Sequence, residues 1–473
     1  MRSCVTSFFL LVLFSATPGG ADVIHLKNGR TIWADHVQET GTHLQYDVGD
    51  NSYAIPKSLV DRVEQGGVPP QFASAASDAH DDLPTFVPNQ DLASDADLPA
   101  KIIHEGHVDR DALSSLESTA KPQTTAAAYF IAGKHELESG NLPQARAYLD
   151  SALRFQSDSP TILNYYAVVL SRMGRTREAL SFAERSAQLA PDSADSFAVL
   201  GFVQFASDRT RDAIRSWKRS LQLRPDATVQ RYLDKAERER KAEADFTERA
   251  SNHFTLHYEG HATSDNLRRS ILMTLETAFD DLSGQLGVSP RESISVFLYT
   301  EQAFFDVTQA PAWSTALNDG KLRIPIQGVD SVTPELARVL KHELSHSFIN
   351  QISHGRCPQW LHEGLAQVLE PRNLSGSGHQ LARLFAADRE IPFNALEGSF
   401  AHYSSLEASL AYAESLAAAE YINETYGMSE FRRILERLGE GVSIEPALRS
   451  TIHSDYAHFQ TDIGKFLATK YGT

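Results

Sequence analysis

The residues with the clearest chemical potential are His342, Glu343 and His346, which form a His-Glu-x-x-His pattern. On an α-helix of 3.6 residues per turn, His342 and His346 lie one above the other on one face, so both imidazoles can bind a single cation. Glu343 lies about 100° round from His342. Its carboxylate would therefore sit beside the metal, where it can accept a proton from a water that the metal activates.

The surrounding sequence predicts the helix that this pattern needs. Thr333 can act as the N-cap, and Pro334 fits the first helical position. Apolar residues then recur at helical spacing, at Leu336, Val339, Leu340 and Leu344. Three fixed residues also meet by chance in roughly a few per cent of chains of this kind, so a second signal is needed.

The second signal is a further helix that opens at Pro358, in which residues 360–366 read Trp-Leu-His-Glu-Gly-Leu-Ala. This combination of helices resembles the gluzincin type of zinc metallopeptidase, within the peptidase MA-like superfamily. The resemblance covers about residues 250 to 470. It implies an α+β zincin-like domain that holds one Zn²⁺ ion, with Glu363 as the third metal ligand beside the two histidines. The metzincin alternative is excluded, because its third histidine would fall on Ile352.

His362 competes with Glu363 for the ligand role, since zinc accepts either side chain and adjacent helical residues point about 100° apart. We favour Glu363, because it shares a polar face with Gln367 and Glu370. We also expect Gly364 to let this helix approach the zinc helix closely. The resemblance further implies Tyr412 as a catalytic residue that steadies the oxyanion; a buried core tyrosine is an equal alternative.

The composition limits the possible partners and the compartment. The chain has 473 residues and a formal charge of −17, which argues against nucleic acid and anionic membranes as partners. Residues 1–21 have the charged, apolar and small-residue regions of a signal peptide. We therefore expect a periplasmic or secreted protein whose mature chain has no membrane span. Cys357 would be its only cysteine, so no intrachain disulfide could form.

Two modules precede the repeats. Residues 22–64 alternate apolar and polar positions around an Asn28-Gly29 turn, which predicts a small all-β module similar to SH3-like domains. Residues 65–124 are rich in Ala, Ser, Asp, Pro and Thr, and we expect them to form a disordered linker.

Residues 125–244 contain a repeat of 34 residues. The positions in register include Ala145, Ala179 and Ala213, and a small trio at Gly133, Ala167 and Gly201. This pattern resembles the tetratricopeptide repeat, which implies an α-helical solenoid of helix hairpins, closed here by a capping helix. Such repeats bind peptides or partner proteins, although a rigid spacer is an equal alternative.

Residues 245–473 would form the metallopeptidase domain. Strands are predicted at 252–260 and 294–299, with a long helix between them and mostly helices after Glu370. A strand at 322–326 contains Pro325, which marks a sheet edge where an extended substrate could pair. All proposed ligands lie here, so residues 22–240 are predicted to be dispensable for metal binding.

The sequence thus predicts a multidomain, exported zinc metallopeptidase in which Glu343 acts as general base on a peptide or protein substrate. The main alternative is a repeat scaffold of the cell envelope whose peptidase-like domain is inactive or structural. Hydrolysis of a non-peptide amide is a further alternative that the sequence does not separate from peptidase action.

Overall fold

The computed structural model describes residues 21–26, 31–34, 36–48, 51–57, 60–67, 92, 97–104, 106–260, 263–308, 316–326, 331–400, 403 and 405–472. Residues 1–20 of the expected signal peptide and the expected Asn28-Gly29 turn lie outside them. The chain divides into two units, residues 1–72 with 402–409, and residues 73–401 with 410–473. Within the described residues, no helix is long and apolar enough to cross a bilayer.

The N-terminal module is built from two small antiparallel sheets. One has the order β2-β1-β6 and the other β3-β4-β5. The buried side chains of Ile24 and Leu44 form its core. The small all-β module is therefore confirmed. Its strands are β1 (Ala21–Leu26), β2 (Thr31–Ala34), β3 (His36–Thr40), β4 (His43–Val48), β5 (Asn51–Pro56) and β6 (Val60–Gly67).

The prediction of a disordered linker over residues 65–124 is wrong for its C-terminal part. The chain forms α2 (Leu98–Ile102), a short hairpin of β7 (Ile103–His104) and β8 (His107–Val108), and α3 (Arg110–Thr119). Asp109 caps α3 through bonds from the amides of residues 111 and 112. Leu98, Ile102 and Leu113 are buried in the core of the repeats. Composition missed this segment, because a few apolar side chains suffice once a neighbouring helix offers a surface.

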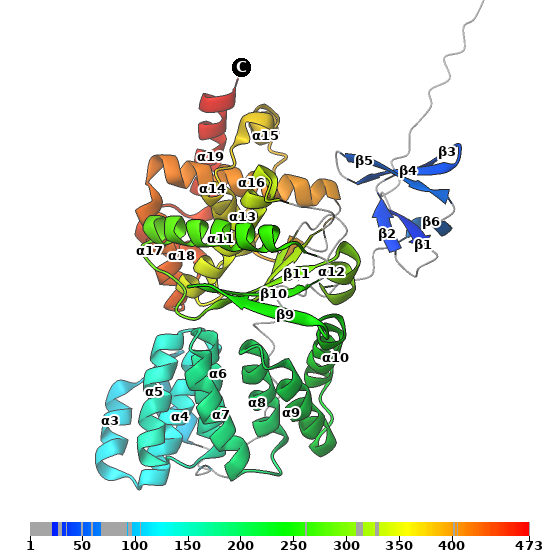
Figure 1. Cartoon of the computed structure of the whole chain (residues 1–473). Coiled ribbons are helices and arrows are strands. Elements are labelled where there is room, and N and C mark those ends of the chain that lie inside the picture. Colours follow the sequence, from blue (N-terminus) through cyan, green and yellow to red (C-terminus); the bar gives the residue numbers. More distant parts are fainter. Residues whose placement is uncertain are drawn as a thin grey trace, which may run out of the picture. The chain divides into compact units, whose positions relative to one another are not determined.

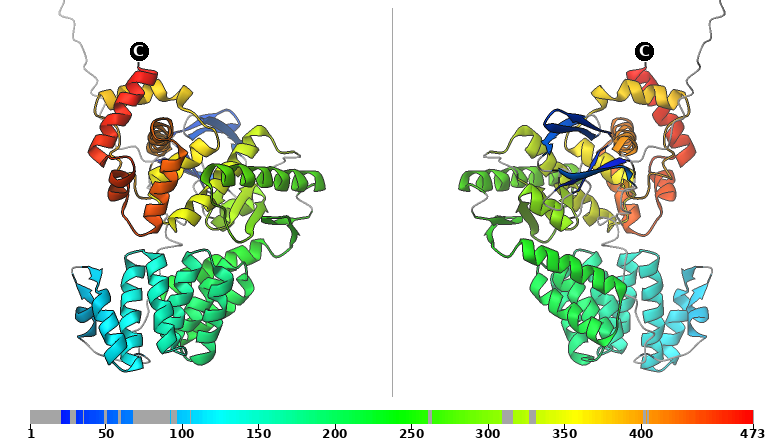
Figure 2. Two further views of the ribbon diagram at one scale, coloured as in Figure 1. Left: turned by 90° about the vertical axis from the view of Figure 1, so that its left-hand side faces the viewer. Right: turned by 90° about the vertical axis from the view of Figure 1, so that its right-hand side faces the viewer.

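From residue 122 to 223, a stretch described without gaps, the chain forms three helix hairpins. The tetratricopeptide-like register is thereby confirmed as a stack of hairpins, which Figure 2 shows side by side. The first pair is α4 (Pro122–Glu138) and α5 (Leu142–Phe155), the second α6 (Pro160–Arg172) and α7 (Thr176–Leu189), and the third α8 (Ala194–Ala206) and α9 (Thr210–Leu223). The predicted capping helix is α10 (Ala227–Ala242).

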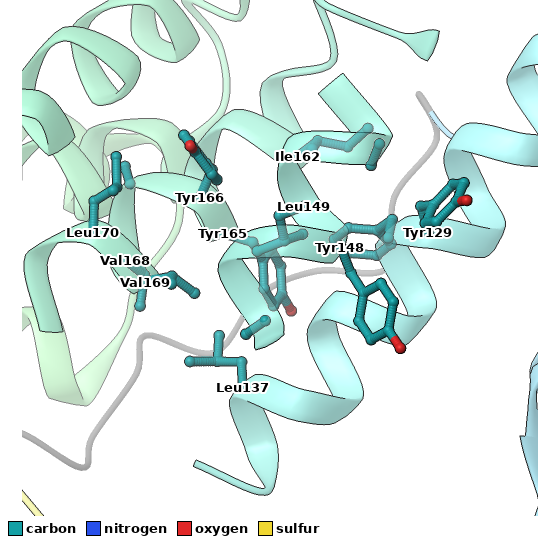
Figure 3. Close-up of a cluster of buried hydrophobic side chains, with 14 of the residues drawn as sticks. Tyr129, Leu137, Tyr148, Leu149, Ile162, Tyr165, Tyr166, Val168, Val169 and Leu170 are labelled. Atoms are coloured by element: carbon teal, nitrogen blue, oxygen red, sulfur yellow. The ribbon is translucent and has the colours of Figure 1, made fainter. Parts of the chain in front are cut away.

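Small residues in register allow the hairpins to close. Ala145, Ala179 and Ala213 are fully buried, and a side chain at Gly201 would lie only 2.4 Å from Nε1 of Trp217. Large apolar side chains then fill the space between hairpins, as Figure 3 shows for Leu149. Buried residues from α2 to α8 form one core cluster and those of α8 to α10 form a second, so α8 contributes to both and the hairpins are not independent.

The C-terminal domain contains a mixed sheet with the order β12-β13-β11-β10-β9. Strand β10 (Phe254–Glu259) pairs in parallel with β11 (Ile294–Tyr299), and β11 pairs in parallel with β13 (Leu322–Pro325). The connection from β10 to β11 is α11 (Asp265–Leu286), the predicted long helix, which runs along the sheet in Figure 1. Strand β9 (Phe246–Ala250), which the sequence pattern missed, adds to β10 in antiparallel orientation.

The predicted edge strand is corrected by this topology. Strand β13, which ends at Pro325, lies inside the sheet between β11 and the short β12 (Leu317–Asn318). Pro325 pairs with Tyr299 of β11, at the end of the strand beyond the two residues that β12 covers. Its missing N–H is tolerated there, and the edge next to the zinc helix is β12.

Helices make up the rest of the domain, as expected after Glu370. The predicted zinc helix is α13 (Pro334–Ser353), and α14 (Gln359–Leu369) follows it. The others are α12 (Glu301–Thr308), α15 (Gly378–Ala386), α16 (Ser405–Thr425), α17 (Met428–Gly439), α18 (Ile444–Thr451) and α19 (Tyr456–Tyr471). Helix α13 packs against both α11 and α14. The residues at the α13–α14 contact therefore lie in the interior of the domain.

Candidate metal centre

Helix α13 begins as its sequence predicts. The hydroxyl of Thr333 accepts a hydrogen bond from the amide of Leu336 at 3.1 Å, and Pro334 occupies the first turn. Leu340 and Leu344 are fully buried on the apolar face. Between them, His342 faces Glu363 and the following Glu370, whereas Lys341 pairs with Asp281 of α11.

Three side chains from two helices converge at this contact. Atoms of His342 and His346 on α13 and of Glu363 on α14 lie within 4.8 Å of one another. Oε2 of Glu363 lies 3.3 Å from Nε2 of His342 and 3.8 Å from Nε2 of His346. Ligand atoms around a tetrahedral zinc lie about 3.3 Å apart, for metal–ligand distances near 2.0 Å. The spacing of the three groups thus fits that geometry.

The polar atoms of this group are buried and incompletely bonded. Oε2 of Glu363 has no partner with hydrogen-bond geometry, and its side chain is only 8% exposed. Its other oxygen, Oε1, accepts a bond from Nε2 of Gln359 at 2.8 Å. Since a buried carboxylate oxygen without a partner is costly, the arrangement favours a cation at this position.

Glu370 adds a carboxylate behind His342. Its Oε1 lies 3.5 Å from Nδ1 of that imidazole, on the side away from Glu363. A carboxylate in this place fixes the orientation and tautomer of a metal-binding histidine. The sequence places Glu370 on the polar face of this helix but indicates no role for it, because only the fold brings α13 alongside.

The surroundings shift the pKa values of the two histidines in opposite directions. Burial lowers the pKa of His342, but the nearby carboxylates of Glu363, Glu370 and Glu343 outweigh this and raise the pKa to about 10. Burial, together with the neighbouring His362 and His342, holds the pKa of His346 well below its ordinary value. The centre therefore holds negative charge that a divalent cation would balance.

The model of the Peptidase MA superfamily matches residues 274–469, a range that contains α13, α14 and all the converging side chains. Residues 274–469 thus match the superfamily that the two helices resemble. No curated protein matches the chain.

Among the solved structures that match, two are named as TPR domains and a third is not. One is the first TPR of Spaghetti (RPAP3) bound to an HSP90 peptide, at 17% identity over 24% of this chain and 91% of that chain, with a TM-score of 0.24. Another is a TPR2AB-domain complex of yeast Sti1, at 13% identity over 67% and 98% of the two chains and a TM-score of 0.23. A third is an O-GlcNAc transferase mutant of Thermobaculum terrenum, at 13% identity over 75% and 98%, with a TM-score of 0.23.

Within the peptidase MA domain, Glu343 lies next to the ligand group. Its side chain is buried, and burial together with the charges of Glu363 and Glu370 raises the pKa of Glu343 to about 7, although the positive His342 opposes this. Burial raises the pKa of the Tyr412 phenol well above its ordinary value. The negative charges of Glu363 and Glu343 raise it further. Gln367 donates a bond to the carbonyl of Tyr412 at 3.0 Å.

Gly364 lies elsewhere than expected. A side chain at Gly364 would meet the carbonyl oxygen of Ser415 at 2.2 Å, so this glycine allows close approach to α16, not to the zinc helix as predicted. His362 does not join the ligand group; its Nε2 lies 3.1 Å from Oδ1 of Asn350 on α13. Cys357 is a free, partly buried thiol whose pKa is raised by burial.

Asn318 was not identified as a site residue from sequence. From the edge strand β12, its Nδ2 donates to the carbonyl oxygen of Glu343 at 2.6 Å and to Oγ of Ser347 at 2.8 Å. The sequence showed only a turn at residues 318–320, and nothing local indicates that its first residue reaches the zinc helix.

Proposed function

We propose that this protein is an exported, zinc-dependent peptidase in which His342, His346 and Glu363 hold one Zn²⁺ ion. The convergence of these three side chains, with the bare Oε2 of Glu363 facing both imidazoles, is the observation that carries the proposal. The donor set of two imidazoles and one carboxylate is one that catalytic zinc uses. When bound, zinc supplies a Lewis acid that acidifies water and polarises a carbonyl.

Glu343 performs the proton transfers in this proposal. Its carboxylate is buried beside the ligand group, where it accepts a proton from the attacking water and delivers it to the leaving amine. Burial raises the pKa of Glu343 to about 7, so its affinity for a proton suits both steps near neutral pH.

Tyr412 and the edge strand complete the proposed site. The high pKa of its phenol keeps Tyr412 protonated, so that it can donate a hydrogen bond to the oxyanion that forms on the scissile carbonyl. Within the described part of the chain, β12 is the edge of the sheet next to α13, where an extended peptide could pair. A peptide or protein is therefore the proposed substrate.

The experiment that tests this proposal uses a library of internally quenched peptides with the purified, zinc-loaded protein. Wild type should cleave members of the library, a chelator should abolish the cleavage, and zinc should restore it. A protein that binds zinc stoichiometrically but cleaves no peptide would favour the scaffold alternative. Export, which the order of charged, apolar and small residues in 1–21 supports, is tested by N-terminal sequencing of the purified protein.

A further inference from the structure

Charged side chains lie buried where the last repeat helix, α10, meets the strands β12 and β13. Arg323 of β13 and Glu239 of α10 are 1% and 0% exposed, and Nη2 of the arginine donates to Oε1 of the glutamate at 2.8 Å. The same guanidinium donates from Nε to Asp319 at 3.0 Å and from Nη1 to the hydroxyl of Tyr299 at 2.7 Å. Arg323 thus joins the sheet to the repeats.

Two further ion pairs connect the repeats to the same hairpin. Nζ of Lys235 on α10 lies 2.7 Å from Oδ2 of Asp319. Nζ of Lys321 lies 2.8 Å from Oδ1 of Asp208, which belongs to the turn between α8 and α9. Asp319, Lys321 and Arg323 therefore each pair with a charged side chain of the repeats.

The Arg323 guanidinium keeps its charge although it is buried. Burial lowers the pKa of Arg323, yet Asp319 and Glu239 outweigh it and raise that pKa well above the ordinary value. Burial of ion pairs brings little net stability compared with apolar packing, because desolvation offsets the attraction. Directed bonds of this kind instead hold the bonded residues in defined positions.

The bonds to Asp319 also hold Asn318 in place, because Asn318 directly precedes Asp319 in the chain. The amide group of Asn318 donates to the carbonyl oxygen of Glu343 and to the hydroxyl of Ser347. Both acceptors lie on α13, one of them on the residue that carries the proposed general base. A short path of bonds therefore runs from Glu239 on α10, through Arg323 and Asp319, to the backbone of Glu343.

We propose that Asn318 is a positioning residue for Glu343 and that the last repeat helix holds Asn318 in place through Glu239, Arg323 and Asp319. This inference rests on the proposed peptidase function for its kinetic consequence. In it the repeats are a part of the catalytic unit and not only a spacer.

A matched pair of substitutions on α10 tests the inference. Glu239→Gln keeps the size of the side chain but removes the charge that faces Arg323. Glu237→Gln makes the same change two residues away, in a surface pair in which Lys218 and Glu237 are 54% and 38% exposed and Nζ–Oε1 is 2.8 Å. With the full-length zinc-loaded protein and the library peptide that is cleaved best, Glu239→Gln should lower kcat on the order of ten-fold. KM and zinc content should stay within about two-fold, and Glu237→Gln should match wild type.

Asn318→Ala provides the second arm. It should lower kcat by at least as much as Glu239→Gln, and the double variant should lose no more than Asn318→Ala alone, since both changes act on one path. Losses that multiply in the double variant, or a Glu239→Gln enzyme that equals the Glu237→Gln control, would overturn the inference.

Amide hydrogen exchange gives a readout that does not need activity. Glu239→Gln should speed exchange in residues 317–323 and 340–347 relative to Glu237→Gln, and unchanged exchange there would count against the inference. If the wild type cleaves no peptide while exchange still changes in this pattern, the peptidase proposal fails and the structural path stands.

Discussion

The imidazole of His362 stacks on that of His346, with ring centroids 4.3 Å apart and planes 12° apart. Its neighbour Glu363 faces the same histidine through Oε2. Two adjacent residues of α14 thus contact one imidazole in different ways, and only the carboxylate lies within the group that could hold a metal.

This relationship predicts opposite results for two alanine substitutions. Glu363→Ala should reduce zinc affinity by more than roughly a hundred-fold, because loss of even an outer partner of a ligand costs about ten- to a hundred-fold. His362→Ala should retain the metal, since it removes a stacking contact and a bond to Asn350. Zinc content of both purified variants checks this, and the reverse pattern would overturn the choice of ligand.

Glu343→Gln should separate metal binding from catalysis. The substitution leaves the three proposed ligands in place but removes the proton acceptor, so zinc content should equal that of wild type. Peptide cleavage should fall on the order of 10²- to 10⁴-fold, the usual contribution of general base catalysis. Full activity of this variant on a peptide that wild type cleaves would exclude the role of Glu343.

Glu370→Gln should weaken zinc binding without abolishing it. Oε1 of Glu370 lies 3.5 Å from Nδ1 of His342, where the carboxylate orients the imidazole. Zinc affinity should drop about ten- to a hundred-fold in competition with a chelator. Glu440→Gln, an exposed change on the C-terminal side of α17, is the control and should bind as wild type. Equal affinity in all three proteins would show that Glu370 does not act on the centre.

Removal of the repeats should destabilise the peptidase MA domain. The sequence predicts that residues 22–240 are dispensable for metal binding, yet a fragment 245–473 lacks Glu239, Lys235 and Asp208, the partners of the β12–β13 hairpin. Its free energy of unfolding should be about 3 kcal/mol lower than that of a fragment 191–473, which keeps all three. Urea denaturation of the two zinc-free fragments measures the difference, and equal midpoints and slopes would contradict it.

Glu414 predicts a pH dependence of stability. The side chain is fully buried and accepts bonds from the amide of Ile391, and burial raises the pKa of Glu414 from 4.5 to about 8. The folded state therefore binds the proton more tightly than the unfolded state, so stability is highest below pH 4.5 for this group and falls as pH rises toward 8. Over that window the loss is about 5 kcal/mol.

Glu414→Gln should remove this loss, because the amide stays neutral while its oxygen can still accept from Ile391. The variant should then be more stable than wild type at pH 8 to 9, by thermal or urea unfolding. An unchanged pH slope in the variant would show that Glu414 is not the group responsible.

The sequence by itself determined the elements and the local chemistry. The spacing of His342 and His346, the cap at Thr333 and the 34-residue register all depend on neighbours within one helix or one repeat, where geometry follows from the helical period. For the same reason the preference for Glu363 over His362 could be stated in advance from the face that each residue occupies.

Only the tertiary structure decided which separate elements meet. The helices at 98–119, strand β9, the inner place of β13 and the contact of Gly364 with α16 all depend on surfaces supplied by distant parts of the chain. The roles of Glu370, Asn318 and Glu239 have no local sequence signal, because each depends on a partner on another element. The free energy of such a contact depends on burial, which only the folded structure determines.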